Sequence, residues 1–163
     1  MQRLKGMKIS QPLSELLAPL FEALPLENAM PELVPVKPRQ AEPVLIVCGL
    51  VSNRLIRENR ALEAALWLYV DELDRSHEVS QTIETPIGSL WHGIMHRREG
   101  DFWNSKYWFR KAGHIQALAG MEPAIFVDKV EKAYRENPAD LLAYQRKEWA
   151  TAFQWCATLE APQ

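Results

Sequence analysis

Apolar residues recur at every third or fourth position in most segments of the chain, which is the period of a helix with one buried face. Pro25 ends the first such segment, 14–24, whose apolar face carries Leu16, Leu17, Leu20, Phe21 and Leu24. Six further helices are predicted, over 61–73, 74–83, 89–98, 101–112, 123–137 and 140–159. The pattern therefore predicts an all-α protein.

Turn-forming residues mark the ends of several predicted helices. Ser89 is the last residue of the turn 85–89 and is expected to cap the helix over 89–98. Gly100 ends that helix, Asp101 begins the next one and Gly113 ends it. Pro123 stands in the first turn of the following helix, where proline is tolerated. Short turns of this kind predict antiparallel helical hairpins.

The segment 25–43 contains five prolines and little periodicity, so we expect an extended connector that either wraps the body or is mobile. The apolar run 44–51 is compatible with a buried strand or a helix, and the helix is favoured because no partner strand is evident. These boundaries divide the chain into an N-terminal helix with a proline-rich arm over 1–43 and a helical-hairpin domain over 44–163.

Composition is that of a soluble globular domain, with 163 residues, 47% hydrophobic and 25% charged. The net charge of -2 argues against a nucleic-acid binder. The longest apolar run is too short to span a bilayer, and the N-terminus lacks the apolar region of a secretory signal. Cys48 and Cys156 form no CxxC pair, which favours a reducing compartment. We therefore expect a cytoplasmic protein with neither nucleic acid nor membrane as partner.

The segment EGDFWNSKYWFRKA, residues 99–112, resembles the second half of a tetratricopeptide repeat. In such repeats a Gly-Asp turn precedes a helix with a small residue, an aromatic residue and an alanine, which here are Ser105, Phe109 and Ala112. The small residue of the preceding helix would be Gly93. Two antiparallel helices approach closely where small residues meet, and the aromatic ring fills the space above them.

The preceding helix pair resembles a second, more divergent unit, with Ser76 and Ala64 in the small positions. Ser76 and Ser105 are 29 residues apart, against about 34 in the family. The resemblance implies stacked antiparallel hairpins, with residues 123–158 as a third layer. The segment from Trp91 to Gly113 is also similar to a family of uncharacterised bacterial and fungal proteins with an HRREGDFWNSKYWFR-type motif, which implies no activity.

Two histidines on one predicted helix form the first candidate site. His92 and His96 are four residues apart and so lie on the same helical face, as do the two zinc ligands of an HExxH motif. Gly93 replaces the glutamate of that motif. The tetratricopeptide register implies that both rings turn inward between helices, with His77 beside them. A metal bound by His92 and His96 would take its third ligand from the candidates His77, Glu78 and Asp101.

Polar residues at positions where a core is expected need hydrogen bonds or a ligand to offset their desolvation. Besides a metal site, two interpretations remain open. The histidines could form a buried network with Ser76, Ser105 or backbone carbonyls. Alternatively, they could act as acid and base in a metal-free catalytic pocket, with His77, His92 and His96 as the catalytic residues.

A basic and aromatic face is the second candidate site. The repeat register implies that Trp91, Arg97 and Arg98 face the concave side, where arginine forks and indole rings could hold a carboxylate or phosphate. The alternative is a solvated face with ion pairs from Arg98 to Glu99 and Asp101. Lys106 and Arg110 extend the basic patch towards Trp108. The predicted ligand-binding residues are Trp91, Arg97, Arg98, Asp101, Trp103, Asn104, Lys106 and Tyr107.

The leading hypothesis from sequence is a binding module for an acidic peptide or a small anionic molecule. The first alternative is an enzyme, such as a metal-assisted hydrolase, that uses the histidine cluster. The second is a purely structural protein that associates with further copies of itself. A metal is the only cofactor that the residues suggest, because the phosphate-loop, dinucleotide and serine-hydrolase motifs are missing from the sequence.

Overall fold

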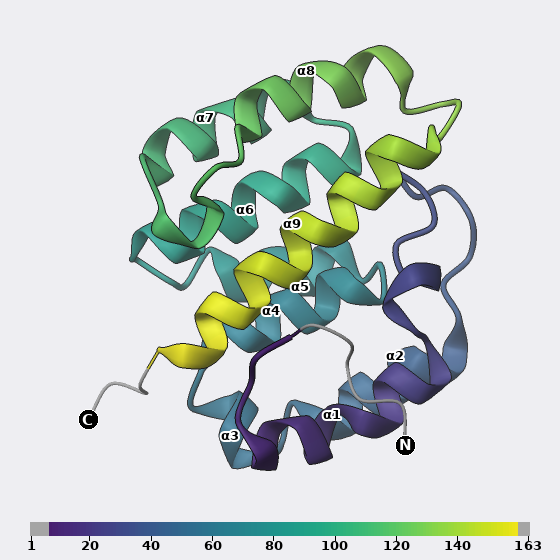
Figure 1. The fold of residues 1–163 in the computed structure, drawn as a ribbon, viewed down its shortest axis with the longest axis vertical. Helices are drawn as coiled ribbons and strands as arrows, with labels where there is room; N and C mark the ends of the chain where they lie inside the picture. Colours follow the sequence, from purple (N-terminus) through teal and green to yellow (C-terminus); the bar gives the residue numbers. More distant parts are fainter. Residues whose placement is uncertain (1–6, 160–163) are drawn as a thin grey trace.

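The computed structural model describes residues 7–159, which form helices and loops and contain no strand in that range (Figure 1). The all-α prediction is confirmed. The apolar run 44–51 lies mainly in a helix, as favoured from its sequence. The helices are α1 (Gln11–Ala23), α2 (Ala41–Leu50), α3 (Arg54–Arg57), α4 (Arg60–Tyr69), α5 (Leu73–Ser80), α6 (Pro86–Glu99), α7 (Phe102–Ala112), α8 (Pro123–Ala133) and α9 (Ala139–Thr158), with the 3-10 turns η1 (Leu26–Asn28) and η2 (Gln116–Leu118).

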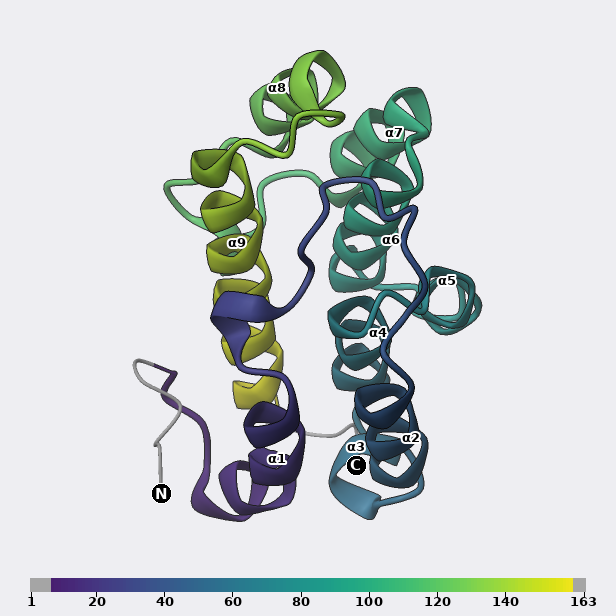
Figure 2. The ribbon, with the colours of Figure 1, turned by 90° about the vertical axis from the view of Figure 1, so that its right-hand side faces the viewer.

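The helices form two layers (Figure 2). One layer stacks α2, α4, α6 and α7 along the long axis of the molecule, and α5 packs on its outer side against α4 and α6. The long helix α9 runs opposite this stack, with α1 below it and α8 above it in the view of Figure 2. Because α9 contacts α4, it covers the inner side of the stack. Among the described residues, no helix is both long and apolar enough to cross a membrane.

Aromatic side chains join the two layers. Trp149 of α9 donates its indole N–H to the carbonyl of Ala65 on α4 at 2.9 Å. Its ring packs against Tyr69 and Phe153, each with a centroid distance of 4.7 Å. Burying large aromatic rings between layers supplies much of the hydrophobic free energy of a small domain. The face of α9 that carries Trp149 and Phe153 is therefore the face that holds this helix in place.

The proline-rich segment 25–43 packs onto the body instead of remaining mobile. The side chain of Arg146 donates to the carbonyl of Ala29 at 2.8 Å, and Gln145 donates to the carbonyl of Met30 at 3.3 Å. Leu33 is fully buried. Apolar residues of α1 belong to the same core cluster as those of α4 and α9. Backbone carbonyls of the proline-rich segment are thus bonded by α9, which satisfies polar groups that burial would otherwise leave unpaired.

The helix pairs α4–α5 and α6–α7 carry the same cross-helix hydrogen bond. The Ser76 hydroxyl donates to the carbonyl of Ala64 at 2.8 Å, and the Ser105 hydroxyl donates to the carbonyl of Gly93 at 2.7 Å. Both bonds join residues twelve apart. A Cβ added to Gly93 would lie 3.1 Å from the Phe109 ring, so the helices approach closely there. The small residues singled out in the sequence are where the paired helices meet.

The start of α6 differs from the prediction. Ser89 was expected to cap this helix, but it is buried inside α6, and Thr85 occupies the capping position before Pro86. Proline is well suited to the first helical position because its fixed φ matches the helix. A backbone N–H at that position would have no partner within the helix, so its absence costs nothing. The turn between α6 and α7 agrees with the sequence: Gly100 adopts a left-handed conformation with φ of 86°, and the Asp101 side chain accepts from the Asn104 N–H. Elsewhere the predicted helix over 61–73 ends at Tyr69 and the one over 123–137 ends at Ala133.

Candidate metal centre

Three imidazole rings converge on the outer side of the helix stack. His77 comes from α5, and His92 and His96 come from adjacent turns of α6. The ring centroids are 4.7 Å apart for His77 and His92, 4.8 Å for His92 and His96, and 5.6 Å for His77 and His96. One nitrogen of each ring lies within 4.8 Å of the other two. The structure thus brings together the pair predicted from spacing and the histidine named as a candidate third ligand.

The helices explain why these rings meet. His92 and His96 share one face of α6 because they are four residues apart. The packing of α5 against that face of α6 places His77 opposite both. The remaining candidate ligand on α5, Glu78, is exposed and does not join the group.

The site is mostly shielded from water and open on one side. His92 is 4% exposed and His96 is 9% exposed, whereas His77 is half-buried. Trp108 of α7 stacks on the His92 ring with a centroid distance of 3.9 Å and an angle of 9°. A flat indole wall fixes the orientation of the imidazole and excludes water from one of its faces. Access to the rings is therefore best from the side of His77.

A carboxylate orients one of the three rings. Glu99 Oε1 lies 2.5 Å from His96 Nδ1, and the two residues are on the same helix. When a carboxylate accepts from Nδ1, the other ring nitrogen is left unprotonated and available as a ligand. Asp101 lies near Glu99 and His96, but its two oxygens accept from the backbone and side-chain amides of Asn104, at 3.1 and 2.6 Å. Asp101 and Asn104 therefore form the start of α7.

The environment favours the neutral form of His92. Burial, then the nearby His96, His77 and Lys111, lower the pKa of His92 from 6.5 to about 3. Neutral imidazole is the form that binds metal ions. An imidazole with this pKa remains unprotonated at neutral pH and cannot act there as a general acid.

The serine hydroxyls do not donate to the histidines. Ser76 and Ser105 instead donate to the carbonyls of Ala64 and Gly93. Within residues 7–159, the one hydrogen bond to the three rings is that between His96 and Glu99. The Nδ1 atom of His92 is buried without a partner among the described residues. A buried unpaired polar atom costs about 1–3 kcal/mol, and the bonds to Ser76, Ser105 or backbone carbonyls that a structural network would supply are not found for this ring within residues 7–159.

Arg97 does not lie on an accessible concave face, contrary to the sequence prediction. Its guanidinium is 0% exposed and makes two bonds to Glu148 of α9, Nη1 to Oε2 at 3.0 Å and Nη2 to Oε1 at 2.7 Å. It also lies over the Phe126 ring, 4.5 Å from its centroid. The two guanidinium donors of Arg97, which were expected to bind an external anion, therefore bind the carboxylate of Glu148 in the same chain.

Arg98 and Trp91 are likewise 0% exposed. Arg98 donates to the carbonyls of Leu68 and Glu32, at 3.0 and 3.1 Å, and its Nη2 lies 2.6 Å from Asp71 Oδ1. The alternative prediction, ion pairs from Arg98 to Glu99 and Asp101, is also wrong. Both arginines bind partners that are distant in the sequence. The periodicity of a single helix cannot identify such partners.

The predicted residues that remain accessible lie on α7. Trp103 is 71% exposed and stacks with Tyr107, with centroids 6.2 Å apart and planes at 10°. Lys106 is paired with Asp128 of α8. Sequence reasoning did not assign Trp108 or Glu99 to the histidine site. The position of Glu99, three residues after His96, was the available signal, since such residues are neighbours on a helix.

Comparison of the chain with family models, curated proteins and solved structures found no match. The function is therefore argued from the geometry of the histidine site.

Proposed function

We propose that His77, His92 and His96 bind a divalent transition-metal ion, with zinc as the first candidate, and that the protein is a metal-assisted hydrolase. The observation that carries the proposal is the convergence of three ring nitrogens within 4.8 Å from two helices. Imidazole nitrogen suits zinc, copper, iron and nickel, whereas carboxylate and water oxygens suit magnesium and calcium. A set of three neutral histidines therefore favours the first group.

The distances fit a site that closes slightly around its ion. Zinc–nitrogen bonds of about 2.0–2.1 Å place ligand nitrogens about 3.4 Å apart in a tetrahedron. The present separations of up to 4.8 Å would shorten by side-chain rotation. His77 is the ring with most freedom for this movement because it is half-buried.

Three protein ligands leave a fourth tetrahedral position for water, which is the pattern of catalytic rather than structural zinc sites. Zinc lowers the pKa of bound water to about 7 and so supplies a hydroxide nucleophile at neutral pH. Glu99 would hold His96 in the binding orientation. The exposed aromatic residues of α7, Trp103 and Tyr107, offer a surface near Trp108 on which a substrate could rest.

The identical serine bonds of the two helix pairs support a second, structural proposal. Ser76 and Ser105 occupy equivalent places in hairpins α4–α5 and α6–α7, as expected for divergent tetratricopeptide units. In that arrangement α9 and the segment around Glu32 fill the concave side that such repeats use for peptides. This occupancy weakens the hypothesis of an acidic-peptide module and favours the histidine site on the outer side.

Zinc titration of chelator-treated protein by calorimetry tests the proposal. We expect one site per chain in the parent protein. Glu99→Gln should weaken zinc binding about 10–100-fold, the range for residues that orient a metal ligand, and His77→Ala should weaken it further because a ligand is lost.

His114→Ala is the matched control. His114 is the fourth histidine of the chain and lies outside the cluster. Its replacement should leave zinc binding unchanged. The metal site would be refuted if His77→Ala and His114→Ala bound zinc with equal affinity, or if the parent protein bound no zinc. Either result would favour a structural or partner-binding role.

A further inference from the structure

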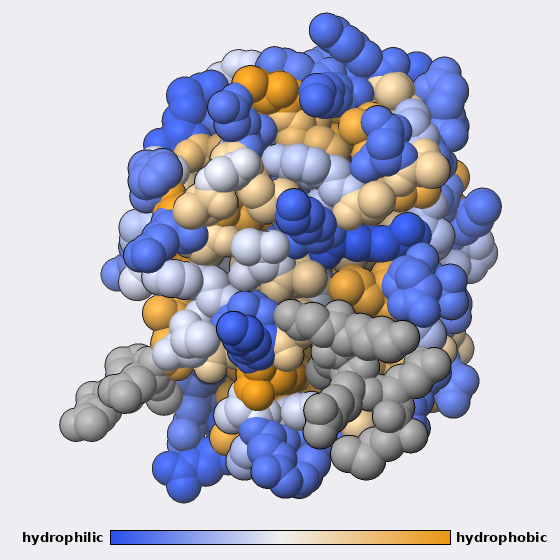
Figure 3. Space-filling model, in the orientation of Figure 1, coloured by the Kyte–Doolittle hydropathy of each residue, from blue (hydrophilic) through white to orange (hydrophobic). Residues whose placement is uncertain are grey.

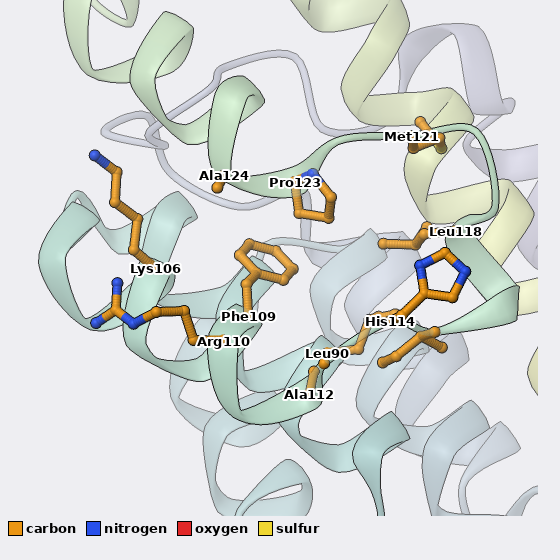
Figure 4. A pocket seen from close by; sticks show the side chains of 12 residues that line it. Leu90, Lys106, Phe109, Arg110, Ala112, His114, Leu118, Met121, Pro123 and Ala124 are labelled. Carbon is orange, nitrogen blue, oxygen red and sulfur yellow. The ribbon is translucent and has the colours of Figure 1, made fainter.

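A cavity separate from the histidine cluster lies between α7, the loop that follows it and the start of α8 (Figure 4). Its volume is about 270 Å³. Apolar side chains supply most of its walls, and Phe109 projects towards its centre (Figure 4). The residues that matter for an apolar guest are Leu90, Phe109, Ile115, Leu118, Met121 and Ala124.

This cavity is on another side of α7 from the histidine cluster. Trp108 stacks on His92, whereas the next two residues, Phe109 and Arg110, line the cavity. Consecutive residues of a helix point about 100° apart, so α7 can contribute side chains to both the histidine cluster and the cavity. In the view of Figure 3, apolar surface lies among polar residues in the upper part of the molecule, where Figure 1 places α7 and α8.

The charge at the cavity is of one sign. Its ionisable lining residues are Lys106, Arg110 and His114, and none of its lining residues carries a carboxylate. Lys106 is already paired with Asp128. Arg110 has no ion pair and no side-chain hydrogen bond to any other residue in the range 7–159. Figure 4 shows Lys106 and Arg110 together on one side of the cavity.

We propose that the cavity binds a small amphipathic carboxylate, with its apolar body against Phe109 and Leu118 and its carboxylate on Arg110. A guanidinium binds a carboxylate through two parallel hydrogen bonds, and such charged bonds are about twice as strong as neutral ones. At about 30 Å³ for each water-sized unit, the volume accommodates roughly nine such units, which corresponds to a medium-chain fatty acid. The apolar walls and the Arg110 guanidinium, which is unpaired within the described residues, select this class over sugars, nucleotides and cations.

Calorimetry and amide NMR with three eight-carbon probes test this proposal. Octanoate should bind, with shifts confined to the end of α7, the following loop and the start of α8. Octanol has the same chain without the charge, and we expect it to bind at least about tenfold more weakly, because it cannot form the charge-assisted hydrogen bonds to the Arg110 guanidinium. Octylamine, which carries the opposite charge, should not bind.

Two variants assign the contacts, and both affect exposed residues, so folding should be retained. Arg110→Gln should remove the preference for octanoate over octanol, whereas the control Arg135→Gln, at another exposed arginine, should keep it. Ala124→Trp should block both probes by filling the mouth of the cavity. Equal binding of octanoate and octanol to the parent, or unchanged binding to Arg110→Gln, would overturn the proposal.

The experiment is run with and without zinc. Octanoate binding is expected to be the same in both conditions and in His77→Ala, because the cavity and the histidine site use different faces of α7. The outcome at the cavity is therefore independent of the outcome at the metal site.

Discussion

Arg97→Ala is expected to lower the free energy of unfolding by about 3–5 kcal/mol, the largest effect of any single substitution considered for this protein. The substitution would leave the Glu148 carboxylate, 1% exposed, without its cationic partner. An isolated buried charge is costly because the interior cannot replace its hydration. It would also remove the stacking of the guanidinium on Phe126. Urea unfolding followed by circular dichroism measures the change.

The double variant Arg97→Met with Glu148→Leu is the matched control. Replacing both members of a buried ion pair by apolar residues of similar size is often neutral or stabilising. We therefore expect the double variant to recover most of the loss seen in Arg97→Ala. An effect below about 0.5 kcal/mol for Arg97→Ala, the usual value at an exposed site, would mean that Arg97 lies on an open face and that α9 does not cover it.

His92→Phe is expected to change stability in opposite directions with and without zinc. In the metal-free protein it should raise the free energy of unfolding by about 1–3 kcal/mol, because it removes the unpaired Nδ1 atom and can keep the stack on Trp108. Zinc at about 1,000 times its dissociation constant should stabilise the parent by about 4.1 kcal/mol and leave the variant unchanged. Thermal unfolding with and without zinc separates the two effects.

A structural histidine would give the reverse result. If His92→Phe destabilised the metal-free protein and zinc had no effect on the parent, the ring would be part of the packing and not a ligand. His92→Leu, which is smaller, guards against a loss caused by crowding alone.

In the absence of metal, we expect the stability of the parent protein and that of His92→Phe to depend differently on pH. The pKa of His92 is about 3 in the folded protein and 6.5 in the unfolded chain. Between these values the unfolded chain binds the proton and the folded protein does not, so stability rises with pH in that window. Acidification from pH 6.5 towards pH 3 should therefore destabilise the parent more steeply than His92→Phe. If the free energy of unfolding fell equally with pH in both proteins, the folded protein would not lower the pKa of His92.

The helices were predictable because their signals are local. Apolar spacing located the long helices, and Gly100, Asp101 and Gly113 placed the ends of α6 and α7 where the structure has them. The His92 and His96 pair follows from helical geometry alone. Ser89 shows the limit of such signals, because α6 begins earlier than expected, with Thr85 before Pro86 at its start.

The partners of Arg97 and Arg98 could not be predicted from the sequence. Glu148 and Asp71 neutralise their charges, and backbone carbonyls accept further hydrogen bonds from Arg98. These partners lie on segments up to 66 residues away. A basic run on a helix is usually solvated, and only the position of α9 and of the proline-rich segment buries this one. The same long-range packing also decides which aromatic residues stay exposed, as Trp103 does and Trp91 does not.

The central claim is that three histidines bind one metal ion, and X-ray absorption at the zinc edge of the zinc-loaded protein tests it most directly. The account predicts three imidazole nitrogens at about 2.0–2.1 Å with one further light ligand, and two imidazoles after His77→Ala. A first shell of carboxylate and water oxygens, or fewer than three imidazoles in the parent protein, would contradict it.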